Sequence, residues 1–234
     1  MRRRLRRLLG KLRGQQIVHF LHIGKTGGTA VKHALDGIHG SGGFLLERHE
    51  HDVTLTHVPV GEKFMFFVRD PIKRFVSGFY SRRRQGRPRY SVPWTPAEQE
   101  AFTSFDTPNQ LALDLSAEDP ARRTKATRAM NGIVHVRSSY WTWFHDEAYL
   151  RSRLADLFFV GFQESLDRDF ERLKRKLALP MGLALPTDEV KAHRNPKGLS
   201  TDLDDVAMNN LTEWYARDYQ FIEICRELSA RGGD

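Results

Sequence analysis

The sequence predicts an α/β fold in which a parallel sheet is covered by helices on both faces. Three apolar runs, each too short for a helix, lie at Gln16–Ile23, Lys63–Val68 and Leu157–Phe162. Each run is followed by a segment with helical periodicity, and strands that alternate with helices form parallel sheets. With 234 residues, 40% of them hydrophobic, the chain is long enough to bury the core of such a domain.

The first strand is followed by a turn and a helix. The turn is Gly24-Lys25-Thr26-Gly27-Gly28-Thr29, and helical character begins at Ala30. A flexible segment, Gly37–Gly43, then leads to a histidine-rich stretch that ends at His57. The next strand is therefore expected only at Lys63.

The second strand runs directly into a helix. It ends at Arg69-Asp70-Pro71, and proline suits the first turn of a helix. The apolar face of this helix is formed by Ile72, Phe75, Val76 and Phe79. Further helices are predicted in the region 97–154, over 164–177 after the third strand, and as one helix around 204–228.

The net charge of +8 is concentrated at one end of the chain. Residues 1–13 carry seven Arg or Lys residues and no acidic residue, so the remaining body is nearly neutral. We expect a basic arm over residues 1–14 and a single domain over residues 15–234. Leucines at 5, 8, 9 and 12 have the spacing of an amphipathic helix, which would rest on an anionic membrane or partner surface. The alternative is a solvated, poorly ordered tail.

Cysteine content and hydropathy restrict the class of protein. The single cysteine, Cys225, excludes an internal disulfide framework and a cysteine-based metal cluster. Its apolar surroundings predict a buried structural residue rather than a nucleophile. No apolar stretch is long enough to span a membrane, and the arm lacks the apolar core of a secretory signal. We expect a cytoplasmic protein, with peripheral membrane contact through the arm as the possible exception.

The turn after the first strand has the composition of an anion site. Such a turn exposes backbone N–H groups at the positive end of the helix dipole. Gly27 and Gly28 allow the main chain to approach phosphate oxygens closely, and Thr26 and Thr29 add hydroxyl donors. Lys25 supplies a full positive charge to a departing phosphate. The alternative is a glycine turn that serves only tight packing.

The letters Gly-Lys-Thr also suggest a Walker A loop. That motif requires a glycine five residues before Gly24, where His19 stands. Lys25 precedes the glycines, whereas the Walker lysine follows them. No metal-binding aspartate is evident after a later strand. A P-loop-like nucleotide or small-molecule kinase is therefore retained only as an alternative function.

A second candidate anion site follows the second strand. Arg69 at the end of a strand offers a planar guanidinium suited to phosphate. Ser77 lies eight residues later, where its hydroxyl could return to the same anion. An ion pair between Arg69 and Asp70, with Ser77 at a helix contact, is the structural alternative.

Together the two segments resemble the donor-binding motifs of the sulfotransferase family. Residues 17–35 resemble the loop that binds the 5′-phosphosulfate, with Gly24 where most members have proline. Residues 69–80 are similar to the 3′-phosphate site, with its Arg-Asp-Pro, Arg and Ser-Gly positions. The resemblance runs from residue 17 to about 179. It implies the P-loop-NTPase-like sulfotransferase fold, a three-layer parallel sheet flanked by helices.

The resemblance also implies the chemistry. The co-substrate would be 3′-phosphoadenosine 5′-phosphosulfate, the product 3′-phosphoadenosine 5′-phosphate, and no metal would be required. Lys25 would contact the oxygen that bridges phosphate and sulfate, and Thr26–Thr29 would bind the 5′-phosphate. Arg69 and Ser77 would bind the 3′-phosphate, with Arg74 as a weaker candidate.

Within the family the chain resembles the carbohydrate-type branch, which includes heparan 2-O-sulfotransferases and chondroitin sulfotransferases. The acceptor implied by this branch is a saccharide hydroxyl. A late basic loop with Arg194 and Lys197 is similar to loops that close over the nucleotide. A non-enzymatic module that binds a membrane or nucleic acid through the basic arm is a further alternative. The nearly neutral body gives no reason to expect nucleic acid.

A histidine is expected to act as the base that takes the acceptor proton. His49-Glu50-His51 resembles the His-x-His segment of the heparan 2-O-sulfotransferases, whose second histidine aligns with His51. His49 and His57 are the alternative bases, and each histidine could instead be a surface residue without a role. His49 and His51 could also form a zinc pair, but further ligands are not evident nearby.

Overall fold

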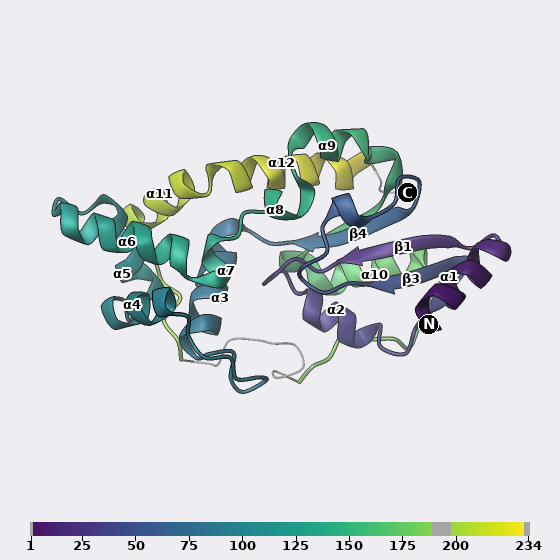
Figure 1. The fold of residues 1–234 in the computed structure, drawn as a ribbon, viewed down its shortest axis with the longest axis horizontal. Coiled ribbons are helices and arrows are strands. Elements are labelled where there is room, and N and C mark those ends of the chain that lie inside the picture. The colour runs from purple at the N-terminus through teal and green to yellow at the C-terminus, as the bar shows by residue number, and fades with distance from the viewer. Residues whose placement is uncertain (1, 189–197, 232–234) are drawn as a thin grey trace. The chain divides into compact units, whose positions relative to one another are not determined.

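The computed structural model describes residues 2–188 and 198–231 (Figure 1), so Arg194 and Lys197 lie outside the described residues. The chain divides into two compact units. We call residues 1–68, 140–192 and 223–234 the sheet unit, and residues 69–139 and 193–222 the helical unit.

The sheet unit contains a five-stranded sheet in the order β2-β3-β1-β4-β5. Its strands are β1 (Gln16–Leu21), β2 (Gly40–Ser41), β3 (Phe44–Arg48), β4 (Lys63–Val68) and β5 (Leu157–Phe162). β1 pairs in parallel with β3 and β4, and β4 pairs in parallel with β5. Only the short β2 is antiparallel to its neighbour. The predicted α/β fold is confirmed, and three of the strands lie where the apolar runs placed them.

Strands β2 and β3 were not predicted. β3 pairs with β1 over five residues, from Gln16 opposite Phe44 to Phe20 opposite Arg48. Its apolar run is only three residues long and is followed by Glu47 and Arg48, so the strand lacks a clear hydrophobic pattern. The charged residues are accommodated by distant groups: Arg48 donates to the Leu35 carbonyl at 2.8 Å and forms an ion pair with Asp36.

Helices cover the sheet on both faces (Figure 1). α2 (Gly28–Ala34) and α10 (Leu166–Lys176) share a buried core with strand residues that include Val18, Phe20 and Phe67. α8 (Trp141–Phe144) contacts the opposite face, where the rings of Phe66 and Phe144 lie 4.5 Å apart. α9 (Glu147–Ser152) follows it along the chain.

The basic arm forms helix α1 (Arg2–Leu12) rather than an irregular tail. Arg7 and Lys11 form ion pairs with Glu62 at 2.7 and 2.8 Å. Gly10 is buried and lies close to Leu45 of β3. In the described part of the chain, no helix combines the length and the apolar character that a membrane span requires.

Four helices of the helical unit begin in the same way. Each has proline in its first turn after an Asp or Thr whose side chain accepts a backbone N–H of the first turn. They are α3 (Pro71–Arg83), α4 (Pro96–Ser104), α5 (Pro108–Leu113) and α6 (Pro120–Gly132). With α7 (Val134–Arg137) and α11 (Asp205–Trp214) they enclose a separate hydrophobic core.

The predicted last helix is two helices, because the chain breaks at Tyr215 between α11 and α12 (Ala216–Arg231). α12 carries Cys225, which is buried, and burial raises the pKa of its thiol well above the ordinary value. The prediction of a structural cysteine is confirmed. Short 3-10 helices lie at Leu55–His57 (η1), Asp114–Ser116 (η2), Leu154–Asp156 (η3) and Gln163–Ser165 (η4).

The helical unit contains a buried, bidentate ion pair. Arg82 of α3 donates to both carboxylate oxygens of Glu98 on α4, at 2.6 and 2.7 Å. Glu98 is fully buried and also accepts the backbone N–H groups of Thr95 and Val134. Burial alone would raise the pKa of Glu98, but the hydrogen bonds from Arg82 and the two N–H groups lower it. One carboxylate therefore ties three segments of the unit together.

Replacing Glu98 with alanine should destabilise the protein by about 3–5 kcal/mol, because the charge on Arg82 is left buried without compensation. The matched control is Glu100→Ala on the same helix, where an exposed pair 3.9 Å from Arg128 should contribute under about 1 kcal/mol. Urea unfolding at pH 7 measures both. Because the pKa of Glu98 is lowered in the folded state, its contribution should be lost as the pH falls below 4.5. Equal effects of the two substitutions would contradict this prediction.

Candidate functional site

The turn between β1 and α2 has the backbone conformation of a tight cradle. Lys25 has φ of +69° and Gly27 has φ of +84°, so two of three consecutive residues adopt the left-handed conformation. The left-handed region is uncommon for a lysine, and it is maintained by the surrounding turn. Thr26 is buried and its hydroxyl donates to the Ile23 carbonyl at 3.0 Å. This buried hydrogen bond holds the turn in its conformation.

Neighbouring side chains leave little room for a side chain at residues 27 and 28. A Cβ at Gly28 would lie 2.5 Å from Cδ2 of the His22 ring, and a Cβ at Gly27 would lie 3.1 Å from Leu166. Gly28 therefore leaves room for the ring of His22 directly beneath the turn. The absence of a side chain at residue 28 was expected to let a phosphate approach the backbone, and it also makes room for the buried ring of His22.

The ring of His22 packs against that of His51, with centroids 4.0 Å apart. Nδ1 of His51 lies 2.8 Å from the His22 carbonyl oxygen, and Trp143 donates its indole N–H to the His51 carbonyl at 3.0 Å. A carbonyl can only accept, so the neutral His51 ring carries its proton on Nδ1. Nε2 is then the unprotonated nitrogen, the form that a general base requires.

Electrostatics favour the neutral form of His51. The atoms packed around the ring lower its pKa below the ordinary 6.5 and outweigh the His22 hydrogen bond, which raises it. The positive charges of Lys32 and Lys25 lower the pKa further. Lys25 therefore lies within electrostatic range of His51 inside the sheet unit. Both of these predicted site residues lie in the sheet unit.

His49 has a different environment. It is buried, and its Nε2 lies 2.8 Å from Nδ1 of His19, whose Nε2 lies 2.7 Å from a carboxylate oxygen of Glu62. Burial lowers the pKa of His19 in spite of the Glu62 contact, so His19 is neutral. It donates from Nε2 to Glu62 and accepts from His49 at Nδ1. His19 and Glu62 were not expected to be functional, because their partners lie 30 and 43 residues apart in sequence.

His57 lies in η1 and is exposed. Its Nδ1 is 3.1 Å from the backbone nitrogen of Thr54, whose N–H it accepts, and so the ring completes a local capping arrangement. Among the three candidate bases, only His51 combines an unprotonated nitrogen with a nearby predicted site residue.

The second predicted anion site belongs to the helical unit. Arg69 directly follows β4, and Ser77 is buried in the second turn of α3. Asp70 caps α3 by accepting the Lys73 N–H at 2.9 Å. Arg74 is buried, donates to the Ser138 carbonyl at 2.6 Å and lies 3.8 Å from Asp218. These contacts favour a structural role for Arg74.

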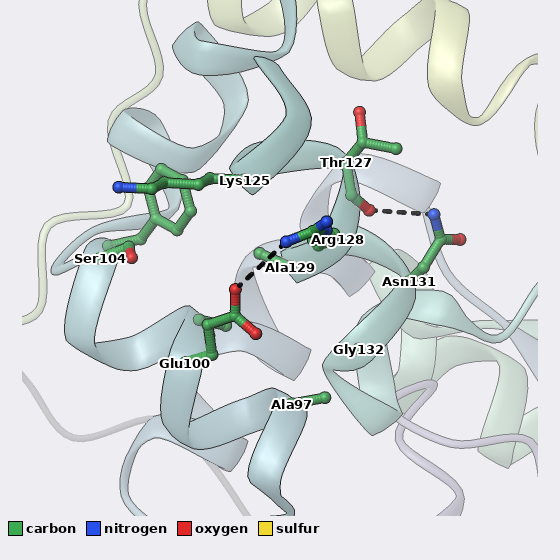
Figure 2. A pocket seen from close by; sticks show the side chains of 11 residues that line it. Ala97, Glu100, Ser104, Lys125, Thr127, Arg128, Ala129, Asn131 and Gly132 are labelled. Carbon is green, nitrogen blue, oxygen red and sulfur yellow. Dashed lines mark hydrogen bonds and ion pairs between the residues drawn. The ribbon is translucent and has the colours of Figure 1, made fainter. Parts of the chain in front are cut away.

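A hollow of about 330 Å³ lies between α4 and α6 in the helical unit (Figure 2). Its lining includes the Glu100–Arg128 ion pair, and both side chains are more than half exposed. Within α6, which forms one side of the hollow, Asn131 donates to the Thr127 carbonyl at 2.9 Å. None of the predicted site residues lines it. It has the character of a solvated groove between helices.

Metal ligation was considered for His49 and His51. Over the described ranges 2–188 and 198–231, no three or more His, Cys, Asp or Glu side chains are grouped so that they could hold a metal ion. The two histidines instead make separate hydrogen bonds, to His19 and to the His22 carbonyl.

Comparison with known proteins identifies the family of this arrangement. A sequence model described as the sulfotransferase family matches residues 13–222, which include the turn after β1, the histidine segment and the Arg69–Ser77 segment. No curated protein matches the chain.

Proposed function

The chain belongs to the sulfotransferase family, and we propose that it transfers a sulfuryl group from 3′-phosphoadenosine 5′-phosphosulfate to a carbohydrate hydroxyl. The observation that carries the proposal is that Lys25 and His51 belong to the same unit and that the charge of Lys25 acts on the His51 ring. A cation on a phosphate-type turn lies within electrostatic range of a neutral histidine whose Nε2 can accept a proton.

The turn after β1 supports the donor site. Lys25 and Gly27 both have left-handed backbone conformations, and Gly27 stands directly before the first turn of α2, where a helix leaves backbone N–H groups without helical partners. An anion is stabilised by such a nest of N–H groups. Thr26 fixes the turn through Ile23, and Thr29 lies in the first turn of α2. These features fit the 5′-phosphate end of the donor.

Arg69 and Ser77 are proposed to hold the 3′-phosphate. β1 and β4 are parallel neighbours, so the turn with Lys25 and the residue that follows Val68 leave the same edge of the sheet. Ligands of open α/β sheets bind at the carboxyl ends of the strands. A guanidinium can contact a phosphate through two N–H groups, which distinguishes a bisphosphate from a nucleotide without a 3′-phosphate.

The proposed reaction uses His51 and Lys25 at opposite ends of the transfer. Nε2 of His51 accepts the proton of the acceptor hydroxyl as the acceptor oxygen forms a bond to sulfur. The bond between sulfur and the bridging phosphate oxygen breaks, and its electron pair remains on that oxygen. Lys25 stabilises the negative charge that develops there. The products are a sulfate ester and 3′-phosphoadenosine 5′-phosphate.

The acceptor is proposed to be a saccharide on the basis of the His49-x-His51 resemblance. A panel of acceptors tests this point: heparan and chondroitin chains against phenols and tyrosyl peptides, each with the same donor. Transfer to phenols alone would refute a carbohydrate acceptor and leave the proposed chemistry intact.

Replacing His51 with asparagine should lower kcat about 10²- to 10⁴-fold, because the acceptor hydroxyl loses its general base. His57→Asn, an exposed histidine a few residues away, is the matched control and should retain wild-type kcat. Sulfate transfer from labelled donor measures both. In the wild type, kcat should fall as the pH drops through a midpoint below 6.5, since protonated His51 cannot accept a proton. An unchanged kcat in His51→Asn would exclude this base.

Calorimetry with 3′-phosphoadenosine 5′-phosphate tests the donor site. Arg69→Ala should weaken binding about 10- to 100-fold, which corresponds to the roughly 1.5–3 kcal/mol of a hydrogen bond to a charged group. Lys25→Ala should lower kcat about 10²- to 10³-fold. Lys73→Ala, an exposed cation on the same helix as Ser77, is the control and should bind normally. Full affinity in Arg69→Ala, or ATP-dependent phosphoryl transfer by the wild type, would overturn the proposed donor.

A further inference from the structure

The arm helix α1 packs on the sheet unit with its leucines outward. Its inward contacts are the buried Gly10, which lies close to Leu45, and the ion pairs of Arg7 and Lys11 with Glu62. Leucines 5, 8, 9 and 12 lie on the other side of the helix and are between 42% and 75% exposed. An amphipathic helix of a globular protein normally turns its apolar face toward the core, so this orientation is reversed.

The charges around this leucine stripe have one sign. Residues 1–13 contain seven Arg or Lys residues and no acid. Of the basic residues whose side chains are described, Arg7 and Lys11 have their acidic partner on the inner side. Arg6 lies beside the leucines on the helix, and Arg13 follows the end of the helix and is exposed. A convex apolar stripe between cationic margins is typical of helices that lie in the surface of an anionic membrane.

We propose that α1 docks the protein on an anionic lipid surface, with the four leucines inserted between headgroups and the basic residues against acidic lipids. A second copy of this chain fits less well, because its own arm would bring the same seven positive charges to the interface. The docking is independent of the sulfuryl-transfer chemistry.

Sedimentation with vesicles tests the proposal on residues 1–234. Wild-type protein should bind vesicles of phosphatidylcholine with 30% phosphatidylserine, and binding should weaken at least about tenfold with phosphatidylcholine alone or at 0.5 M salt. Leu8→Gln/Leu12→Gln should lower binding about tenfold or more. The control is Val60→Gln/Met181→Gln, which changes two residues that are about 80% exposed elsewhere in the sheet unit.

Three outcomes would overturn the proposal. These are wild-type binding no stronger to acidic than to neutral vesicles, equal binding by the two double variants, and light scattering in which wild type is a dimer and Leu8→Gln/Leu12→Gln a monomer. The last outcome would assign the stripe to a second copy.

A second, independent observation is the buried chain of contacts from Glu62 through His19 to His49. The rings of His19 and His49 are coplanar, with 1° between their planes and centroids 5.1 Å apart, as required for a hydrogen bond in the ring plane. Glu62 accepts from His19, which fixes the tautomer of His19 and therefore the direction in which His49 must donate. The segment that carries His51 is anchored through His49, whose backbone N–H also donates to Phe20 at 3.1 Å.

We infer that His19 and Glu62 are positioning residues for His51, and this inference rests on the proposed function. Both act through His49, which lies two residues before the base. A displaced base loses transfer rate but leaves the donor turn intact, so the effect should fall on kcat and not on donor affinity.

The test compares Glu62→Leu, which removes the acceptor, with Glu62→Gln, whose amide oxygen can still accept from His19. Glu62→Leu should lower kcat about tenfold or more, with affinity for 3′-phosphoadenosine 5′-phosphate within about twofold of wild type. Glu62→Gln should recover most of this loss, and His19→Phe should reproduce it. Equal kcat in the leucine and glutamine variants, or parallel losses of kcat and nucleotide affinity, would overturn the inference. If wild type transfers no sulfate, the proposed function fails instead.

Discussion

The parallel pairing of β1 with β3 and β4 is the constraint on which the candidate site depends. It directs the carboxyl ends of three strands to one edge of the sheet. The turn with Lys25 follows β1, and the segment with His51 follows β3. The candidate groups are far apart in sequence, and each is attached to a strand end whose register is fixed by neighbouring backbone hydrogen bonds. A site built this way owes its geometry to the sheet rather than to the loops.

The proposed chemistry requires a neutral histidine, and the environment of His51 favours that form. Packing around the His51 ring lowers its pKa, and the positive charge of Lys25 acts in the same direction. The cation that would stabilise the departing phosphate therefore also helps to keep the base unprotonated. The carbonyl of His22 adds the remaining condition, since it selects the tautomer in which Nε2 can accept a proton. His22 itself fits beneath the turn because residue 28 is glycine.

The sequence predicted what depends on local patterns and missed what depends on distant partners. Strands β1, β4 and β5 are continuous apolar runs, and the start of α3 is marked by Asp70-Pro71, so both could be foreseen. β3 was missed because it ends in two charged residues, Glu47 and Arg48, and the contacts that accommodate Arg48 are made elsewhere in the fold. The choice among the three histidines was open for the same reason. It depends on the His22 carbonyl for His51 and on His19 for His49, neither of which can be recognised from spacing.

The orientation of helix α1 depends on one largely buried carboxylate, that of Glu62. The leucine spacing predicts an amphipathic helix but does not determine which face meets the protein. Burial alone would raise the pKa of Glu62, but its hydrogen bonds with Lys11 and His19 lower it and keep the carboxylate charged. A charged Glu62 attracts the basic face of the helix, and the leucines are left outside. Each leucine side chain would gain about 1.5–3 kcal/mol on full burial, and the four leucines are between 42% and 75% exposed. Most of the free energy that burial of the leucines would release is therefore not realised in the isolated chain. Insertion into an apolar surface with acidic groups at its margin would release it.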